Sequence, residues 1–417
     1  MTGASTAVGA PAGTAVVTGL GVLAPNGLGT EAYWSATLSG RSGIGPITEY
    51  DGSGYPCRFV GDVLDFDPRE HVPSRLMPQT DPLTRFAVAA SDWAVADAGI
   101  VPGSLDDLGM GVVTANASGG FYFTQREIQN LWTKGPHHVS AYQSFAWFYA
   151  VNTGQISIRH GMRGPGDVLV ADQAAGLDAV GHARRQIRRG TPLMVTGGME
   201  APLNPYAMVA QISHGKLSRA RVAERAYMPF SPDADGFVPA EGGAILVTED
   251  AASARERGAP RCYGEIAGYA ATFDPLPQTG RPPALRRAAE LAIADAGLTP
   301  DGIDVVFADA AGTPEADRVE ADTIAALFGP EGVPVTAPKT MTGRMLAGGP
   351  PVDVAAALLA IRDQVIPPTV NVPELHPDWR LDLVRDRPRE ARLATALILA
   401  RGHGGFNSAL VVRAAEL

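Results

Sequence analysis

The sequence has little cysteine, little lysine and no long apolar run. Its two cysteines, Cys57 and Cys262, form neither a disulfide framework nor a metal-ligand spacing, which favours a reducing cytoplasm. No apolar run is long enough to span a bilayer, so we expect no membrane attachment. Residues 1–14 lack the basic start and apolar core of a signal peptide, and we expect them to form a loose tail.

The charge is acidic, with a net value of −10 and a pI of about 5.3, which argues against nucleic acid as a partner. Hydrophobic residues make up 45% of the chain and charged residues 19%, a composition typical of a globular protein rather than a disordered one. A chain of 417 residues is long for a single domain and is expected to fold as two halves.

An internal repeat supports two similar α/β halves. Ala96-Asp-Ala-Gly-Ile-Val-Pro102 and Ala294-Asp-Ala-Gly-Leu-Thr-Pro300 each close a predicted helix and precede an apolar strand. Asp81 before Pro82 is typical of a helix start, and Gly99 is typical of a helix end. The recurrence of helix, stop and strand in the same order predicts a duplicated architecture.

A turn between a strand and a helix carries Gln173 where a reactive nucleophile is expected. Short apolar residues from Val168 to Val170 lead into small residues, and a helical pattern follows. A residue at such an elbow is expected to be exposed at a helix N-terminus, where a cysteine would have a lowered pKa. Glutamine has a non-basic amide and forms no useful acyl intermediate, so we predict that this position is not a nucleophile.

Six segments besides the elbow form a specific pattern. They are Thr18-Gly-Leu-Gly-Val-Leu-Ala-Pro-Asn-Gly27, Gln79-Thr-Asp-Pro82, Ser144-Phe-Ala-Trp-Phe-Tyr-Ala-Val-Asn-Thr-Gly-Gln-Ile-Ser-Ile-Arg159, Val238-Pro-Ala-Glu-Gly-Gly243, Ala337-Pro-Lys-Thr-Met-Thr-Gly-Arg344 and Arg401-Gly-His-Gly-Gly-Phe-Asn-Ser408. With the elbow, they resemble the β-ketoacyl synthases. Glutamine in place of cysteine is the mark of the chain-length factor, the ketosynthase beta subunit of type II aromatic polyketide synthases. The similarity runs from Ala15 to about the last residue.

The resemblance implies an α/β fold of the thiolase-like class. In this fold two duplicated halves stack as helix, sheet, helix, sheet and helix layers, a five-layered αβαβα arrangement. We expect an N-terminal half of the β-ketoacyl synthase type over residues 15–255 and a C-terminal half over 256–417. The junction is placed near 251–264, after a strand at 244–248.

The resemblance also implies that the catalytic set is missing. Catalytic relatives use two histidines to polarise the malonyl thioester, and this sequence has Asp309 and Arg344 at the matching positions. Aspartate is a poor donor to a developing enolate and arginine cannot shuttle protons. We expect the two side chains to form a salt bridge across the inactive site. Lys339 matches the family's lysine, and a structural ion pair or hydrogen-bond donor is the favoured interpretation.

The loop Arg401-Gly-His-Gly-Gly405 lies between two predicted strands, 396–400 and 407–413. In catalytic relatives it reads Phe-Gly-Phe-Gly-Gly and supplies an oxyanion-hole amide and a gating phenylalanine, so Arg401 is a further departure. His403 could titrate, but a lone loop histidine is usually structural.

Gly19-Leu-Gly-Val-Leu-Ala24 matches a dinucleotide fingerprint in its glycine spacing. Pro25 would break the helix that must bind the pyrophosphate. A tight turn after a strand at 15–18 is therefore the favoured interpretation.

Phe121, Thr124 and Ile128 share one face of a predicted helix with Leu131. From periodicity alone, core packing is the ordinary interpretation. In chain-length factors the matching positions line a tunnel at the dimer interface, where side-chain bulk limits the length of the polyketide. Phe121 and Thr124 match a pattern of factors for shorter chains. Ile128 is smaller than the phenylalanine of some relatives and leaves room for extra acetate units.

Four arginines, Arg184, Arg185, Arg188 and Arg189, flank the end of the elbow helix. A solvated terminus that complements the helix dipole is the favoured interpretation. A docking patch for an acidic acyl carrier protein is less favoured, because in this family the catalytic partner does most of that docking.

The favoured function is that of a non-condensing subunit in antibiotic biosynthesis. It pairs with a cysteine-bearing ketosynthase alpha subunit, completes the tunnel and sets chain length during malonyl extension on an acyl carrier protein. The aromatic stretch Ser144–Tyr149 is expected at the interface of this obligate heterodimer. We expect no metal and no cofactor of its own, since the carrier protein holds the phosphopantetheine.

Two alternatives follow from the same residues. In the first, the chain decarboxylates malonyl carrier protein to supply an acetyl starter, with Gln173 donating a hydrogen bond to the thioester enolate. A related glutamine-bearing domain does this, but it retains its histidines. In the second, the chain is a free-standing thiolase-like acyltransferase, which the missing nucleophile argues against.

Overall fold

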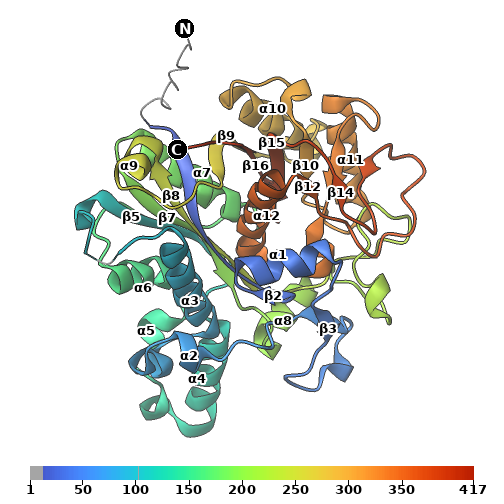
Figure 1. Cartoon of the computed structure of the whole chain (residues 1–417). Helices are drawn as coiled ribbons and strands as arrows, with labels where there is room; N and C mark the ends of the chain where they lie inside the picture. The colour runs from blue at the N-terminus through green and yellow to red at the C-terminus, as the bar shows by residue number, and fades with distance from the viewer. Residues whose placement is uncertain (1–12, 102) are drawn as a thin grey trace.

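The structure is a computed structural model that describes residues 13–101 and 103–417. The tail predicted over residues 1–14 lies almost entirely outside the described residues. A large sheet runs through the molecule with helices packed on its faces (Figure 1). Within the described ranges, no helix has the length and apolar character that a membrane crossing needs.

The sheet consists of two halves with the same strand order. The first reads β6–β5–β7–β8–β1 and the second β11–β10–β15–β16–β9. The strands of the first half are β1 (Ala15–Ala24), β5 (Met110–Ala115), β6 (Gly166–Leu169), β7 (Leu193–Glu200) and β8 (Gly242–Asp250). Those of the second are β9 (Gly264–Phe273), β10 (Val305–Phe307), β11 (Pro334–Thr336), β15 (Thr395–Arg401) and β16 (Phe406–Arg413). Both halves thus follow the order third, second, fourth, fifth, first, the duplication that the sequence repeat predicts.

Strand β1 joins the halves because it pairs antiparallel with both β8 and β9, with Val16 opposite Glu265 and Val17 opposite Gly264 at the second contact. Between β8 and β9 the chain forms α9 (Ala251–Glu256). The predicted boundary between the two halves, 255/256, lies at the end of this helix. The remaining strands are short: β2 (Gly27–Leu28), β3 (Ile44–Pro46), β4 (Phe59–Gly61), β12 (Val365–Ile366), β13 (Asp382–Leu383) and β14 (Arg389–Glu390).

Long helices lie in layers between and outside the sheet halves (Figure 1). They are α3 (Pro82–Asp97), α6 (Val151–His160), α7 (Ala175–Arg188), α10 (Leu285–Asp295), α11 (Pro314–Phe328) and α12 (Gly349–Asp363). Helices α7 and α12 lie between the halves, α3 and α6 pack on the outer face of the first, and α10 and α11 on that of the second. The αβαβα arrangement is the predicted thiolase-like fold.

The central layer is the most buried part of the molecule. Every residue of α12 from Gly349 to Ile361 is buried, because a helix between two sheets has no solvent face. Gly176 allows α7 to approach α12 closely: a Cβ atom there would lie 2.5 Å from the carbonyl oxygen of Ala347 and 2.6 Å from Cδ of Pro351. These contacts place the N-terminus of α7, and hence the elbow, beside the second half.

The other helices lie mainly beside the first half: α1 (Thr30–Leu38), α2 (Pro68–His71), α4 (Phe121–Lys134), α5 (Gln143–Ala146) and α8 (Pro205–Ser213). Helix α4 packs against α5 and α8, in the lower part of Figure 1. The helix predicted from the spacing of Phe121, Thr124 and Ile128 is therefore formed.

The prediction of a turn at the early glycines is wrong, because β1 continues through Ala24. A Cβ atom at Gly19 would lie 2.1 Å from the carbonyl oxygen of Ala94, and one at Gly21 would lie 2.0 Å from that of Ala90. The glycines thus allow α3 to lie directly on the strand. Their spacing reflects helix–strand packing rather than a turn or a dinucleotide site.

Candidate functional site

The elbow lies between β6 and α7, as the sequence predicts. Asp172 adopts a left-handed conformation with φ of 50°, which turns the chain sharply before Gln173. Gln173 is only 3% exposed, so the expectation of an exposed side chain is wrong. The side chain is covered because it faces residues of the second half rather than solvent.

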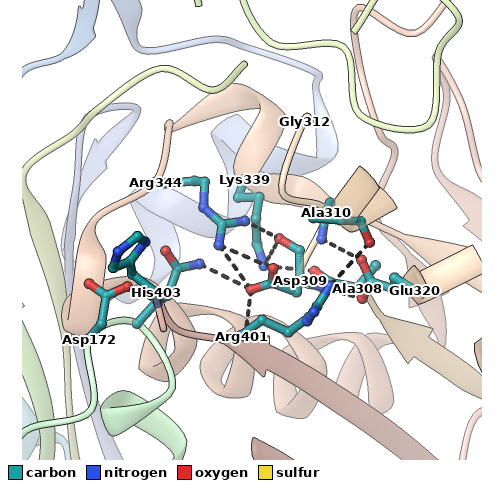
Figure 2. Close-up of polar contacts among 12 residues, drawn as sticks. Asp172, Ala308, Asp309, Ala310, Gly312, Glu320, Lys339, Arg344, Arg401 and His403 are labelled. Carbon is teal, nitrogen blue, oxygen red and sulfur yellow. Dashed lines mark hydrogen bonds and ion pairs between the residues drawn. The ribbon is translucent and has the colours of Figure 1, made fainter. Parts of the chain in front are cut away.

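Asp309 lies just after β10 and is fully buried. Glu320 of α11 fixes the backbone around it: its carboxylate accepts hydrogen bonds from the amides of Asp309 at 2.7 Å and Ala310 at 2.8 Å (Figure 2). Burial raises the pKa of Glu320 to about 7, and the charge of Asp309 raises it too, while the two amides act in the opposite direction. Asp309, which the sequence resemblance predicts at the position of the first histidine of catalytic relatives, is therefore held in place by Glu320.

Arg344 and Asp309 form the predicted salt bridge. Nη2 of Arg344 lies 3.1 Å from each carboxylate oxygen of Asp309, and Nη1 donates to the Asp309 carbonyl oxygen at 2.6 Å. Burial, the largest single effect, lowers the pKa of the guanidinium, but the charges of Asp309 and Tyr227 and the hydrogen bonds with them together raise it above its ordinary value. The pair is charged and buried, so each partner depends on the other.

Two further donors reach the same carboxylate. Oδ1 of Asp309 accepts hydrogen bonds from Nε2 of Gln173 at 3.3 Å and from the backbone amide of Arg401 at 3.0 Å. The loop that supplies an oxyanion-hole amide in catalytic relatives thus donates one of its amides to the chain's own aspartate. The hydrogen-bond donors of the site are therefore bound by a side chain of the same protein.

Lys339 forms the structural ion pair expected from its sequence context. Its Nζ lies 2.7 Å from Oδ2 of Asp353 and donates to the carbonyl oxygens of Ala308 at 2.7 Å and Asp309 at 3.2 Å. Burial raises the pKa of Asp353, and the charge of Lys339 acts in the opposite direction. Lys339 therefore ties α12 to the loop after β10.

Arg401 and His403 occupy the loop between β15 and β16. The guanidinium of Arg401 turns toward Asn407, donating to its Oδ1 at 3.2 Å. The His403 amide donates to Oδ2 of Asp172 at 2.6 Å, and its ring lies 4.6 Å from that of His214. Burial lowers the pKa of His403, and the charges of Lys216 and His214 lower it further. The loop is thereby attached to the elbow.

A cavity of about 280 Å³ extends from this cluster toward α4 and α8. Gln173, Asp309 and Arg344 line one side, which we call the closed end together with the Arg401 amide. Phe121 of α4 and Ala207 and Ala210 of α8 line the other, which we call the open end together with the exposed face of α4. The structure thus brings Phe121 and Gln173 to one cavity.

Thr124 and Ile128 do not line the cavity of this single chain. Oγ1 of Thr124 accepts a hydrogen bond from Nε2 of Gln143 at 3.4 Å. Ile128 is 40% exposed on the same helix.

The apolar surface beside α4 is aromatic and exposed. Its members are Leu131, Trp132, Tyr142, Trp147, Phe148 and Tyr149, of which Trp132 is 81% exposed and Trp147 46%. Monomeric proteins rarely expose an apolar patch of this kind without a partner. The patch includes Trp147, Phe148 and Tyr149, the last three residues of the stretch predicted to lie at an interface.

The prediction of a solvated arginine cluster is wrong for Arg184. This side chain is buried, donating to Oδ2 of Asp295 at 2.5 Å and to the carbonyl oxygen of Ala267. It ties α7 to the second half of the sheet. Arg185, Arg188 and Arg189 are exposed, as expected.

Two parts of the site are not indicated by the sequence pattern. Asn204 followed by Pro205 is a helix-start signal for α8. This signal does not predict that the helix lines the cavity. The support that Glu320 gives to Asp309 depends on a turn of the chain that only the structure defines.

The closed end is unsuited to acyl transfer. The position of the nucleophile holds an amide, and the donors that would stabilise a developing oxyanion already bind Asp309. The arrangement supplies structural cohesion and a closed wall for the cavity.

Comparisons with known proteins agree with this geometry. The beta-ketoacyl synthase N-terminal domain family matches residues 14–253, and the C-terminal domain family matches residues 263–373. The chain is 59% identical over 399 residues to the tetracenomycin polyketide synthase ketoacyl synthase beta subunit of Streptomyces glaucescens, covering 95% of this chain and 98% of the relative.

Two solved structures have the same fold. The ishigamide ketosynthase/chain length factor superposes with a TM-score of 0.88 at 28% identity, covering 97% of this chain and 99% of that one. A type II polyketide synthase acyl-carrier protein in complex with its ketosynthase bound to the hexaketide superposes with a TM-score of 0.86 at 28% identity. The match covers 96% of this chain and 99% of that one. The chain therefore belongs to the beta-ketoacyl synthase family, among the beta subunits, or chain-length factors, of polyketide ketosynthases.

Proposed function

We propose that this chain is the non-condensing subunit of a heterodimeric type II polyketide ketosynthase. The observation that carries the proposal is the closed end, where the residues replacing the nucleophile and both histidines bind one another. Such a cluster favours a scaffold role over a catalytic one. Carbon–carbon bond formation then falls to the cysteine-bearing alpha subunit.

The role assigned to this chain is to complete the polyketide tunnel and set the length of the product. Phe121 lines the cavity, while Thr124 and Ile128 continue along α4 toward the exposed aromatic patch. An alpha subunit covering this patch would enclose the open end. Side-chain bulk along α4 would then limit how far the chain extends, because packed interiors resist overfilling.

The remaining partner of the complex is an acyl carrier protein that presents malonyl units. Its phosphopantetheine is the only prosthetic group that the reaction requires, so this chain needs no cofactor or metal of its own. We place the complex in the cytoplasm, since Cys57 and Cys262 are free thiols.

The alternative of a starter-forming decarboxylase is less well supported. Its proposed donor, Nε2 of Gln173, is directed to Asp309, and the matching histidine positions hold Asp309 and Arg344. An enolate would have to displace a buried carboxylate to reach these donors. A free-standing acyltransferase lacks a nucleophile at the elbow.

The proposal is tested with the complex reconstituted from both subunits and carrier protein. Phe121→Ala enlarges the cavity and should shift products toward longer chains, whereas Ile128→Trp should shift them toward shorter ones. Total malonyl consumption should change less than the product ratio, because the condensing groups lie on the partner. Mass spectrometry of the products measures both quantities. If both variant complexes stay intact and make the parental length, the assignment to chain-length control is wrong.

A further inference from the structure

Two side chains link α4 to α8 beside the cavity. Oε1 of Gln125 accepts hydrogen bonds from Nδ2 of Asn204 and from the backbone amide of Tyr206, both at 2.8 Å. Nδ2 of Asn204 also donates to the carbonyl oxygen of Phe121 at 3.1 Å. We call Gln125 and Asn204 the α4–α8 clamp.

Asn204 anchors the clamp in the interior, whereas Gln125 is half-buried. Asn204 is 1% exposed, and its Oδ1 caps α8 by accepting from the amide of Ala207 at 3.4 Å. One buried amide therefore fixes both the start of α8 and its distance from the first turn of α4. Buried polar groups of this kind are costly to leave unpaired, so the two helices have one preferred spacing.

That spacing fixes how α4 and α8 lie relative to each other at the open end of the cavity. Phe121 of α4 and Ala207 and Ala210 of α8 line this end, and the clamp joins the two helices beside them. The rings of Phe121 and Tyr206 meet edge to face, with centroids 5.3 Å apart and planes at 82°. A change of helix spacing would move Phe121 relative to α8 without altering any lining side chain.

Helix α4 has separate anchors on its other sides. Oδ2 of Asp81 accepts from the amide of Phe123 at 2.8 Å, and Oε2 of Glu127 accepts from the amide of Ser140 at 2.7 Å. These contacts do not involve α8. Loss of the clamp should therefore loosen one wall of the cavity and leave the helix in place.

We propose that Gln125 and Asn204 are positioning residues for product length, which set the distance between the two helices, α4 and α8, that line the open end of the cavity. This inference rests on the proposed function. It differs from the role of Phe121, because neither clamp side chain is among those lining the cavity. Length is then controlled by helix spacing as well as by side-chain bulk.

The test uses Gln125→Leu in the reconstituted complex. The ratio of longer to parental products should change by about threefold to tenfold, the size that the free energy of a hydrogen bond produces. Gln125→Glu keeps the accepting oxygen and should restore the parental ratio. Asn204→Asp keeps the cap on α8 but removes the donor, and it should reproduce the shift of Gln125→Leu.

Gln364 provides a matched control. Its amide also links two segments, donating to the carbonyl oxygens of Ile361 at 2.7 Å and Leu393 at 2.8 Å, at the end of α12. Gln364→Leu should lower stability without changing product length. A shift in Gln364→Leu equal to that in Gln125→Leu would mean that the ratio reports general loosening, and the clamp would be rejected.

Phe121→Ala, measured in parallel, separates the two proposals. If Phe121→Ala changes product length while Gln125→Leu and Asn204→Asp do not, the role assigned to the clamp is wrong and the proposed function stands. If none of the three changes it, chain-length control by this chain is itself wrong. Should Gln125→Leu fail to assemble, the comparison of Asn204→Asp with the parent complex decides.

Discussion

The two ends of the cavity are built by opposite means. At the closed end, three donor groups, one each from Gln173, Arg344 and Arg401, form four hydrogen bonds to the buried carboxylate of Asp309. At the open end, Phe121 and two alanines form an apolar wall that continues into exposed side chains. The closed end is complete within the single chain, whereas in the proposed function a second protein encloses the open end. The proposed function thus places the missing catalytic residues and the partner surface on opposite sides of one cavity.

The largest expected effect is at the closed end. Asp309→Ala leaves the buried guanidinium of Arg344 unpaired and should lower the free energy of unfolding by about 3–5 kcal/mol. Urea denaturation of the complex measures it. Asp309→Ala with Arg344→Leu should recover part of the loss. As the matched change at the open end, Thr124→Val removes a longer hydrogen bond and should cost at most about 1 kcal/mol. Equal losses in the two single variants would contradict the distinction between the ends.

The second effect concerns association at the open end. Trp147→Asp should weaken binding of the alpha subunit by about 2 kcal/mol, or roughly thirtyfold in Kd, because charge is disfavoured in an apolar interface. Trp147 is 46% exposed, so the fold of the isolated chain should change little. Val101, 65% exposed after α3, offers a control in Val101→Asp. Analytical ultracentrifugation compares the two, and equal affinities would exclude Trp147 from the interface.

A smaller effect is expected from pH at the support of α4. Burial raises the pKa of Asp81 to about 7, although it accepts hydrogen bonds from the amides of Phe123 and Leu83. The folded state therefore keeps a proton that the unfolded state has already lost. The stability due to this group should decline as pH rises from about 4 to about 7, by about 1 kcal/mol or more.

This decline is measured by thermal unfolding between pH 5 and 8. Asp81→Asn should flatten the slope of the melting temperature against pH. Asp106, an exposed capping residue, provides the control Asp106→Asn, which should leave the slope unchanged. A parental slope in Asp81→Asn would show that Asp81 does not titrate in this range.

The last prediction is that restoring a thiol at the elbow has no effect on condensing activity. Gln173→Cys restores a thiol at the elbow, but Asp309 and Arg344 still occupy the histidine positions and the Arg401 amide remains bound to Asp309. Intact-mass measurement after incubation with malonyl carrier protein should find no acyl adduct on the parent chain. The variant should gain no condensing activity with an inactive partner. A stoichiometric adduct on the parent would overturn the non-catalytic assignment.

Local and repeated features could be predicted from the sequence. The elbow, the duplicated halves and the helix carrying Phe121 follow from periodicity and turn signals. The pairing of Asp309 with Arg344 follows from the charges of the two replacements. The burial of Gln173 and Arg184 could not be predicted, because it depends on how the second half packs against α7.

The clamp illustrates the same limit. Gln125 and Asn204 are 79 positions apart in the sequence. The sequence pattern around each residue does not predict which residue it contacts. Likewise, the role of the β1 glycines in allowing close packing of α3 is evident only from the structure, in which α3 lies on the strand. Such contacts between distant segments decide where a helix sits to within an ångström, which periodicity does not encode.

The complete burial of α12 has a consequence for how the protein is made. This helix begins at Gly349 and packs between both sheet halves, so the first half cannot finish its core until most of the chain has left the ribosome. Until then, the inner face of β8 and one side of α7 stay uncovered. Incompletely covered apolar surfaces make nascent chains prone to aggregate. We therefore expect synthesis of this subunit to depend on chaperones until the last quarter of the chain emerges.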